Sequence, residues 1–178
     1  MASRFPHRRD PNAENRVSSF ELFYDLVFVF AITQTTHLLI EHLSWLGALQ
    51  SGMILLTVWW AWQYTTWVTN ELNADAIPVQ LVLVAIMLGS LLMSIAIPEA
   101  FGDKAELFAF SYVFIQVGRH LFLTFVAADP GTIERSRSAH ILNWFSVSAV
   151  FWITGAFAGG DTQIILWIVA LTIDSAGP

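Results

Sequence analysis

Cysteine is absent from this chain of 178 residues, so disulfides, thiolate metal sites and cysteine nucleophiles are excluded. Charge is also scarce: 12% of the residues are Asp, Glu, Lys or Arg, whereas a soluble domain carries about 25%. The net charge of −6 and the lack of an Arg- and Lys-rich patch with interleaved aromatics argue against a nucleic-acid partner. No catalytic triad spacing, zinc-protease motif or phosphate-binding loop is present. We therefore expect no metal and no cofactor, and an enzyme is the less favoured class.

Apolar residues are abundant instead. They make up 56% of the chain, which holds eight Trp and fourteen Phe. Such a composition leaves too few polar side chains to cover a surface facing water. The sequence therefore predicts an all-α, polytopic transmembrane helical bundle whose main partner is the lipid bilayer.

Six candidate spans are separated by residues that favour turns. A helix needs about 20 apolar residues to cross the hydrocarbon core. The candidates are roughly residues 18–42, 46–69, 78–97, 105–128, 139–158 and 162–173. Pro78 suits the first turn of the third helix. The last segment is short, so we expect it to be tilted or re-entrant, or the chain to stop before a structure that continues; we favour the second.

The distribution of cations predicts the orientation. With the N-terminus in the cytoplasm, one side of the membrane holds Arg4, Arg8, Arg9, Arg16, Arg135 and Arg137, and the other holds only Lys104. This bias is typical of a cytoplasmic N-terminus. We expect residues 1–17 to form an Arg-rich cytoplasmic tail and residues 18–178 a transmembrane domain.

Polar residues inside the spans are the candidate functional residues. Asp25 lies in an almost wholly apolar stretch, and Glu21 lies one helical turn earlier on the same face. A carboxyl at membrane depth costs a few kcal/mol, so such groups face an interior, a partner or water. The predicted intramembrane polar site comprises Glu21, Asp25, Gln34, His37, Gln116, Arg119 and His120.

An ion pair between Asp25 and Arg119 is geometrically reasonable, because both lie at similar distances from the cytoplasmic ends of their spans. Two interpretations stay open. The pair is either a clamp between two helices or a gated charge pair on the path of an ion or substrate. Gln34 and His37 have the further interpretation of hydrogen bonds between helices.

The second span holds a cluster of aromatic residues, namely Trp59, Trp60, Trp62, Tyr64 and Trp67. An interfacial belt with helix packing is favoured over an aromatic cavity for an apolar or cationic ligand. Asn70, Asn73 and Asp75 follow at the cytoplasmic boundary. Their oxygens suit a hard cation, but solvated loop residues are the favoured interpretation.

Two motifs carry a family resemblance. Residues 18–34 (SSFELFYDLVFVFAITQ) with His37, and Trp59-Trp-Ala-Trp62 followed by Trp67, Asn70, Asp75 and Pro78, resemble the bacterial low-temperature-requirement A (LtrA) family. Gln80 stands where the family usually has Arg, so the resemblance implies no role for that position. Two signatures of the family's second half, His-x-x-Glu-Arg and Leu-Gly-Glu-Ser, are absent, so the chain resembles an N-terminal half. The resemblance implies a multi-pass protein of the bacterial inner (plasma) membrane linked to growth in the cold, without an established molecular activity.

Three functions remain as hypotheses. The leading one is a transporter or channel-like component for an ion or small molecule, because paired charges in spans often mark such routes. The alternative is a non-catalytic membrane scaffold or lipid-interacting protein, in which the charges clamp helices together. The third is an intramembrane enzyme with Asp25 or Glu21 as acid or base. Helix faces left without a partner would also favour a homo-oligomer.

Overall fold

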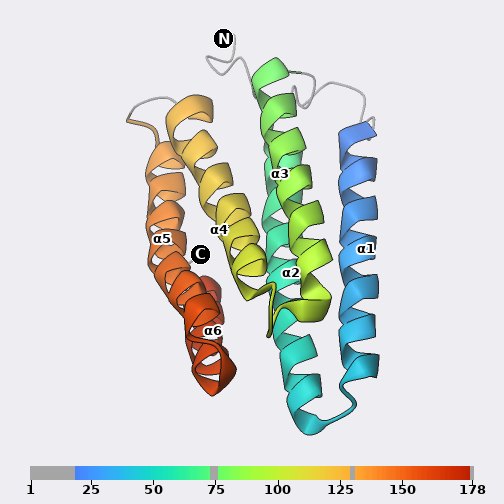
Figure 1. Cartoon of the computed structure of the whole chain (residues 1–178). Helices are drawn as coiled ribbons and strands as arrows, with labels where there is room; N and C mark the ends of the chain where they lie inside the picture. Colours follow the sequence, from blue (N-terminus) through green and yellow to red (C-terminus); the bar gives the residue numbers. More distant parts are fainter. Residues whose placement is uncertain (1–18, 73–75, 129–130, 177–178) are drawn as a thin grey trace.

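The computed structural model describes residues 19–72, 76–128 and 131–176, and the regular elements in these ranges are helical. The predicted tail, residues 1–17, lies outside them. The described residues form six α-helices, with a 3₁₀ turn after the third and a π-helical segment after the fourth (Figure 1). Their bounds are α1 Ser19–Glu41, α2 Trp45–Glu71, α3 Ile77–Ala96, η1 Ile97–Glu99, α4 Ala105–Phe122, η2 Leu123–Ala127, α5 Ile133–Ala158 and α6 Gly160–Ala176.

Local chemistry sets several helix ends. Pro78 lies in the first turn of α3, as predicted. Gly159 and Gly160, with φ of 65° and 55°, make the turn between α5 and α6 in a region that side chains with a Cβ rarely adopt. The helix α5 begins at Ile133 rather than near residue 139, because the Thr132 hydroxyl caps it by accepting a hydrogen bond from the backbone N–H of Arg135 at 3.3 Å.

The helices run antiparallel to their neighbours in the chain. In Figure 1, α4 lies between α3 and α5, and α1 stands at the edge of the bundle farthest from α5. The helix α1 packs against both α2 and α3, while α6 packs mainly against α5 and also touches α2. The end of α6 reaches the buried face of α4, because Tyr112 of α4 donates a hydrogen bond to Asp174 of α6.

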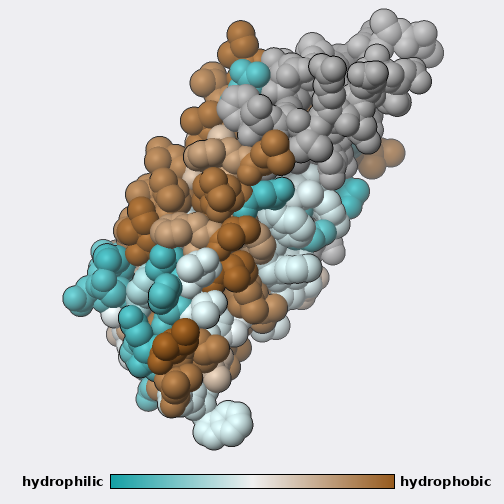
Figure 2. Space-filling view, turned by 90° about the vertical axis from the view of Figure 1, so that its right-hand side faces the viewer, coloured by the Kyte–Doolittle hydropathy of each residue, from teal (hydrophilic) through white to brown (hydrophobic). Residues whose placement is uncertain are grey.

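The outer surface is apolar, as expected for a helix bundle in lipid. Leu22, Leu26 and Phe125 are each more than 60% exposed. Figure 2 shows hydrophobic side chains across the middle of the face that carries α1. Among the described residues, four stretches are long and apolar enough to cross a membrane: Leu22–Glu41, Ile77–Glu99, Ala105–Ala127 and Ile133–Ala158.

The two remaining α-helices differ from these four for separate reasons. The helix α2 has 27 residues, but its Trp and Tyr side chains lower its mean hydropathy. The helix α6 has 17 residues and a length of about 26 Å. It continues through Asp174 to Ala176, beyond the predicted end at residue 173. The all-helical prediction is confirmed.

A candidate charged site in the bundle interior

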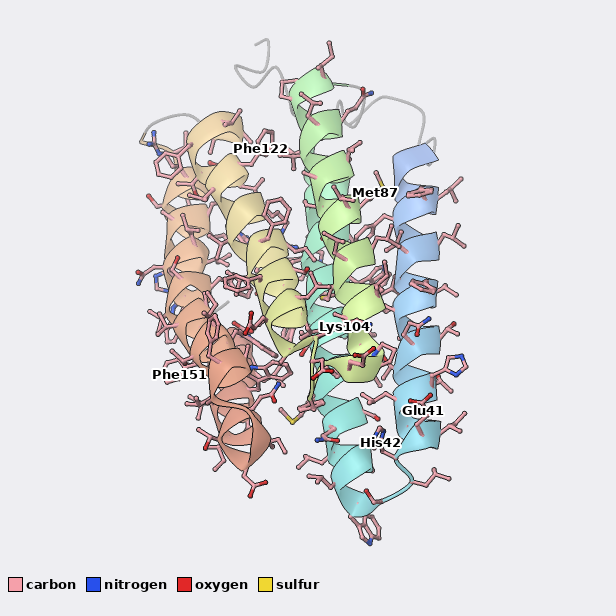
Figure 3. The ribbon with its side chains drawn as sticks, viewed as in Figure 1. Glu41, His42, Met87, Lys104, Phe122 and Phe151 are labelled. Carbon is pink, nitrogen blue, oxygen red and sulfur yellow. The ribbon has the colours of Figure 1, made fainter. Side chains whose placement is uncertain are left out.

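One face of α4 carries three polar side chains into the interior. Tyr112, Gln116 and Arg119 follow one another at spacings of four and three residues, so they share a face of the helix. Each is at most 1% exposed. Lys104, which precedes α4, and Phe122, which ends it, mark the two limits of this helix in Figure 3.

Neutral groups hold the guanidinium of Arg119. Its Nη1 donates to the Ala61 carbonyl at 3.3 Å and to the Thr65 hydroxyl at 3.0 Å, both on α2. Its Nη2 donates to Gln116 Oε1, and its Cζ lies 5.2 Å from the centre of the Tyr64 ring. Arg119 therefore joins α4 to α2 through hydrogen bonds and a cation–π contact.

The hydrogen bonds continue from Gln116 to a carboxylate on α6. Gln116 Nε2 donates to Tyr112 Oη at 3.0 Å, and Tyr112 Oη donates to Asp174 Oδ2 at 2.9 Å. Trp152 Nε1 of α5 donates to the same oxygen at 3.1 Å. We call Arg119, Gln116, Tyr112 and Asp174 the buried relay. Each hydrogen bond between members of the relay is donated in the direction of Asp174, whose Oδ2 accepts from both Tyr112 and Trp152.

Several polar atoms around the relay keep unused hydrogen-bonding capacity. Within the described residues, Arg119 Nε, Asp174 Oδ1, Tyr64 Oη and both ring nitrogens of His120 are buried without a hydrogen-bond partner. The His120 ring stacks on Phe145 with centroids 5.3 Å apart. Buried polar groups are usually paired, so each unpaired one calls for an explanation, such as a water, an ion or a functional role.

Asp25 lies apart from the relay. It occupies an exposed position on α1 and accepts a hydrogen bond from Trp62 Nε1 at 3.0 Å. No ion pair joins Asp25 to Arg119 in the described part of the chain, so the expected pair is not formed. The helix α2 contacts both residues, because Trp62 reaches Asp25 while the preceding Ala61 carbonyl binds Arg119.

The other predicted polar residues fall into two groups. Gln116, Arg119 and His120 are brought together on α4. Gln34 is half-buried and His37 exposed on α1, and no hydrogen bond links either to the relay within the described ranges. The side chains of Glu21 and Asn70, and the residues Asn73 and Asp75, lie outside what the structure describes.

The aromatic cluster divides between two sides of α2. Trp59 and Trp62 lie outward, with ring centroids 5.9 Å apart. Tyr64 lies inward, 2% exposed, and its ring contacts Trp60 at 5.7 Å and Trp67 at 5.6 Å. Tyr64 is the ring of this cluster that contacts Arg119 and His120, and Trp62 is the one that binds Asp25.

Asp174 is the important residue that the sequence reasoning did not select. It directly follows the predicted end of the last span at residue 173. A signal was present, because Gln163, Trp167, Ala170 and Asp174 recur at helical spacing and share the buried face of α6. In the described part of the chain, no group of three or more His, Asp or Glu side chains could hold a metal ion.

Comparison with known proteins gives the family. The family model described as bacterial low temperature requirement A protein (LtrA) matches residues 16–178. An uncharacterized protein of Rhizobium meliloti (strain 1021) is 37% identical over 182 residues, covering 100% of this chain and 44% of that protein. The chain thus spans less than half the length of this curated relative. No solved structure matches the chain. The chain belongs to the bacterial low temperature requirement A family.

Proposed function

We propose that this chain is a proton-coupled component of a membrane transporter, with the buried relay as its charged centre. Family membership and four long apolar helices indicate an integral membrane protein. We further propose six spans in the bacterial inner membrane with a cytoplasmic N-terminus, since six antiparallel helices and the bias of the Arg residues support this arrangement.

One observation carries the proposal: a buried arginine and a buried aspartate are linked through two neutral side chains instead of touching. Direct contact would give the strongest Coulombic attraction, and separation forgoes much of it. Ionisable groups held at membrane depth often mark proton or ion routes. Asp174 lies about 21 Å along the axis of α6 and is 1% exposed, so the bundle encloses it.

The chemistry follows from the free carboxylate oxygen. Asp174 Oδ1 takes up a proton, and the carboxyl becomes neutral. Its attraction for the Tyr112 hydroxyl and the Trp152 indole then weakens, which loosens the contact of α6 with α4 and α5. Arg119 is left without a counter-charge, and this favours release of the proton afterwards. In the proposed coupling step, protonation of Asp174 weakens the contact of α6 with α4 and α5, and release of the proton restores it.

The test is proton flux in vesicles that contain the purified chain and an internal pH-sensitive dye. The account predicts flux down an imposed pH gradient and a loss of at least about tenfold in Asp174→Asn, since the amide has no titratable proton. Asp103→Asn, the same change at an exposed position before α4, should retain the flux. Equal flux from Asp174→Asn and the unchanged chain would contradict the proposal.

A structural role as a membrane scaffold is the second candidate. The observation in its favour is that the relay and Trp152 join α2, α4, α5 and α6. A scaffold would show no proton flux when folded, while Asp174→Asn would lower its melting temperature. The same two measurements on the same samples therefore separate the two functions.

A further inference from the structure

The helices α1 and α2 meet along an outward-facing seam. On α1, Asp25, Phe28 and Ile32 follow one another at helical spacing and face α2. On α2, Trp62, Trp59 and Leu55 do the same in the opposite direction. We call this strip the α1–α2 seam. It lies on the side of α2 away from the buried relay, and the proposed function makes no use of it.

The end of the seam nearest the N-terminus combines a carboxylate with aromatic rings. Trp62 Nε1 binds Asp25 Oδ1 at 3.0 Å, and no other hydrogen bond to this carboxylate is formed within the described residues. Phe28 stacks on Trp62 at 5.3 Å, and Trp59 is 50% exposed beside it. An exposed carboxylate next to indole faces is the chemistry that recognises ammonium groups.

The other end of the seam is hollow. A groove of about 320 Å³ is lined mainly by Ile32, Thr35, Thr36, Ser51, Gly52 and Leu55. Its walls are small or apolar, and Gly52 leaves open space where a side chain would stand. Two helical turns separate Asp25 from Ile32, and likewise Trp62 from Leu55, a distance of about 10 Å. The carboxylate and the groove therefore lie on one continuous line.

We propose that the α1–α2 seam binds a phospholipid with an amine headgroup. Its ammonium group contacts Asp25, Trp59 and Trp62, and one acyl chain runs along the seam into the groove. The first apolar span begins at Leu22, so Asp25 lies one turn inside it, near the depth where headgroups meet hydrocarbon. The negative charge of Asp25 favours a headgroup that carries an ammonium group. A second copy of this chain would present the same Asp25 and repel it.

Spin-label measurements in vesicles test this site. The probes are phosphatidylethanolamine and phosphatidylglycerol, each with a nitroxide on the acyl chain, and the readout is the fraction immobilised by the protein. We expect preference for the ethanolamine lipid by about threefold, the size of an exposed cation–π contact. Asp25→Asn should remove the preference, and Glu41→Gln, a carboxyl at the far exposed end of α1, should keep it (Figure 3).

A second variant changes the groove proposed for the acyl chain and leaves the headgroup site unchanged. Gly52→Leu fills the groove, and no atom lies within 4 Å of a Cβ built at that position, so the helix accommodates it. Immobilisation of both lipids should fall in this variant. Equal affinity for the two headgroups in the unchanged chain would overturn the proposal. So would displacement of the ethanolamine lipid by a synthetic transmembrane peptide with one lysine, since that result would assign the seam to a helix.

Discussion

Arg119 is the residue on which the interior depends most. It is 0% exposed and holds two helices through four contacts. Arg119→Met keeps much of the side-chain volume but removes the charge and leaves Asp174 uncompensated. We expect a loss of about 3–5 kcal/mol in the free energy of unfolding. Arg119→Lys should recover only part of this loss, because an ammonium group lacks the fork that reaches both Thr65 and Gln116.

A matched control for this prediction is available on the surface. Lys104 and Glu99 form an ion pair at 2.6 Å with side chains 37% and 48% exposed. Lys104→Met should cost no more than about 1 kcal/mol, as exposed pairs usually do. Unfolding in mild detergent, monitored by circular dichroism, measures the free energy of unfolding of both variants. Equal losses at the two positions would show that Arg119 is not the interior clamp.

At the scale of elements, the hairpin of α5 and α6 depends on a glycine. A Cβ built at Gly155 would lie 2.6 Å from Trp167 Cδ1 and 2.8 Å from its Nε1. Trp167 is fully buried and donates to the Trp152 carbonyl at 3.0 Å, so its ring has little freedom to move. Gly155→Ala should therefore separate the two helices and destabilise the chain by about 1–3 kcal/mol.

A second glycine provides the comparison. Nothing lies within 4 Å of a Cβ built at Gly118 of α4. Gly118→Ala should stabilise the helix by up to about 1 kcal/mol, because alanine has the higher helix propensity. Melting temperatures of the two variants, measured side by side, should shift in opposite directions. Shifts of the same sign would mean that the contact at Trp167 does not limit the packing of α5 on α6.

At the scale of the whole molecule, the bundle predicts which ends face the same side of the membrane. Leu43 and Ile133 lie at opposite ends of the helices and are 81% and 85% exposed (Figure 1). The chain has no cysteine, so Leu43→Cys and Ile133→Cys each introduce a unique thiol. A membrane-impermeant maleimide added to intact cells should label the first variant and, with a cytoplasmic N-terminus, spare the second. Labelling of both from outside would contradict the orientation.

The sequence predicts where the helices begin and end better than it predicts which helices pack against one another. Most helix ends follow from local properties of the sequence, namely the apolar runs, Pro78 and the glycines at 159 and 160. The partners of Arg119 are not local. Asp25 and Arg119 lie at similar depths in their spans, so an ion pair between them is reasonable from the sequence. In the structure Arg119 binds neutral groups, and the carboxylate at the end of its hydrogen-bond chain is Asp174. From the sequence alone, the carboxylate of Asp174 indicates the end of a span. Its place in the interior follows only from the hydrogen bonds that Tyr112 and Trp152 donate to it.

The variant Tyr112→Phe tests the central claim most directly, because it removes one hydroxyl from the relay and keeps the ring packed against Trp152. Proton flux and melting temperature are measured on the same vesicle preparation. If the contact between Tyr112 and Asp174 is the coupling step, flux should fall by at least about tenfold, well beyond the loss of folded protein that the melting temperature indicates. Retained flux, or a fall in melting temperature that accounts for all lost flux, would contradict the account and leave the relay as a clamp between helices.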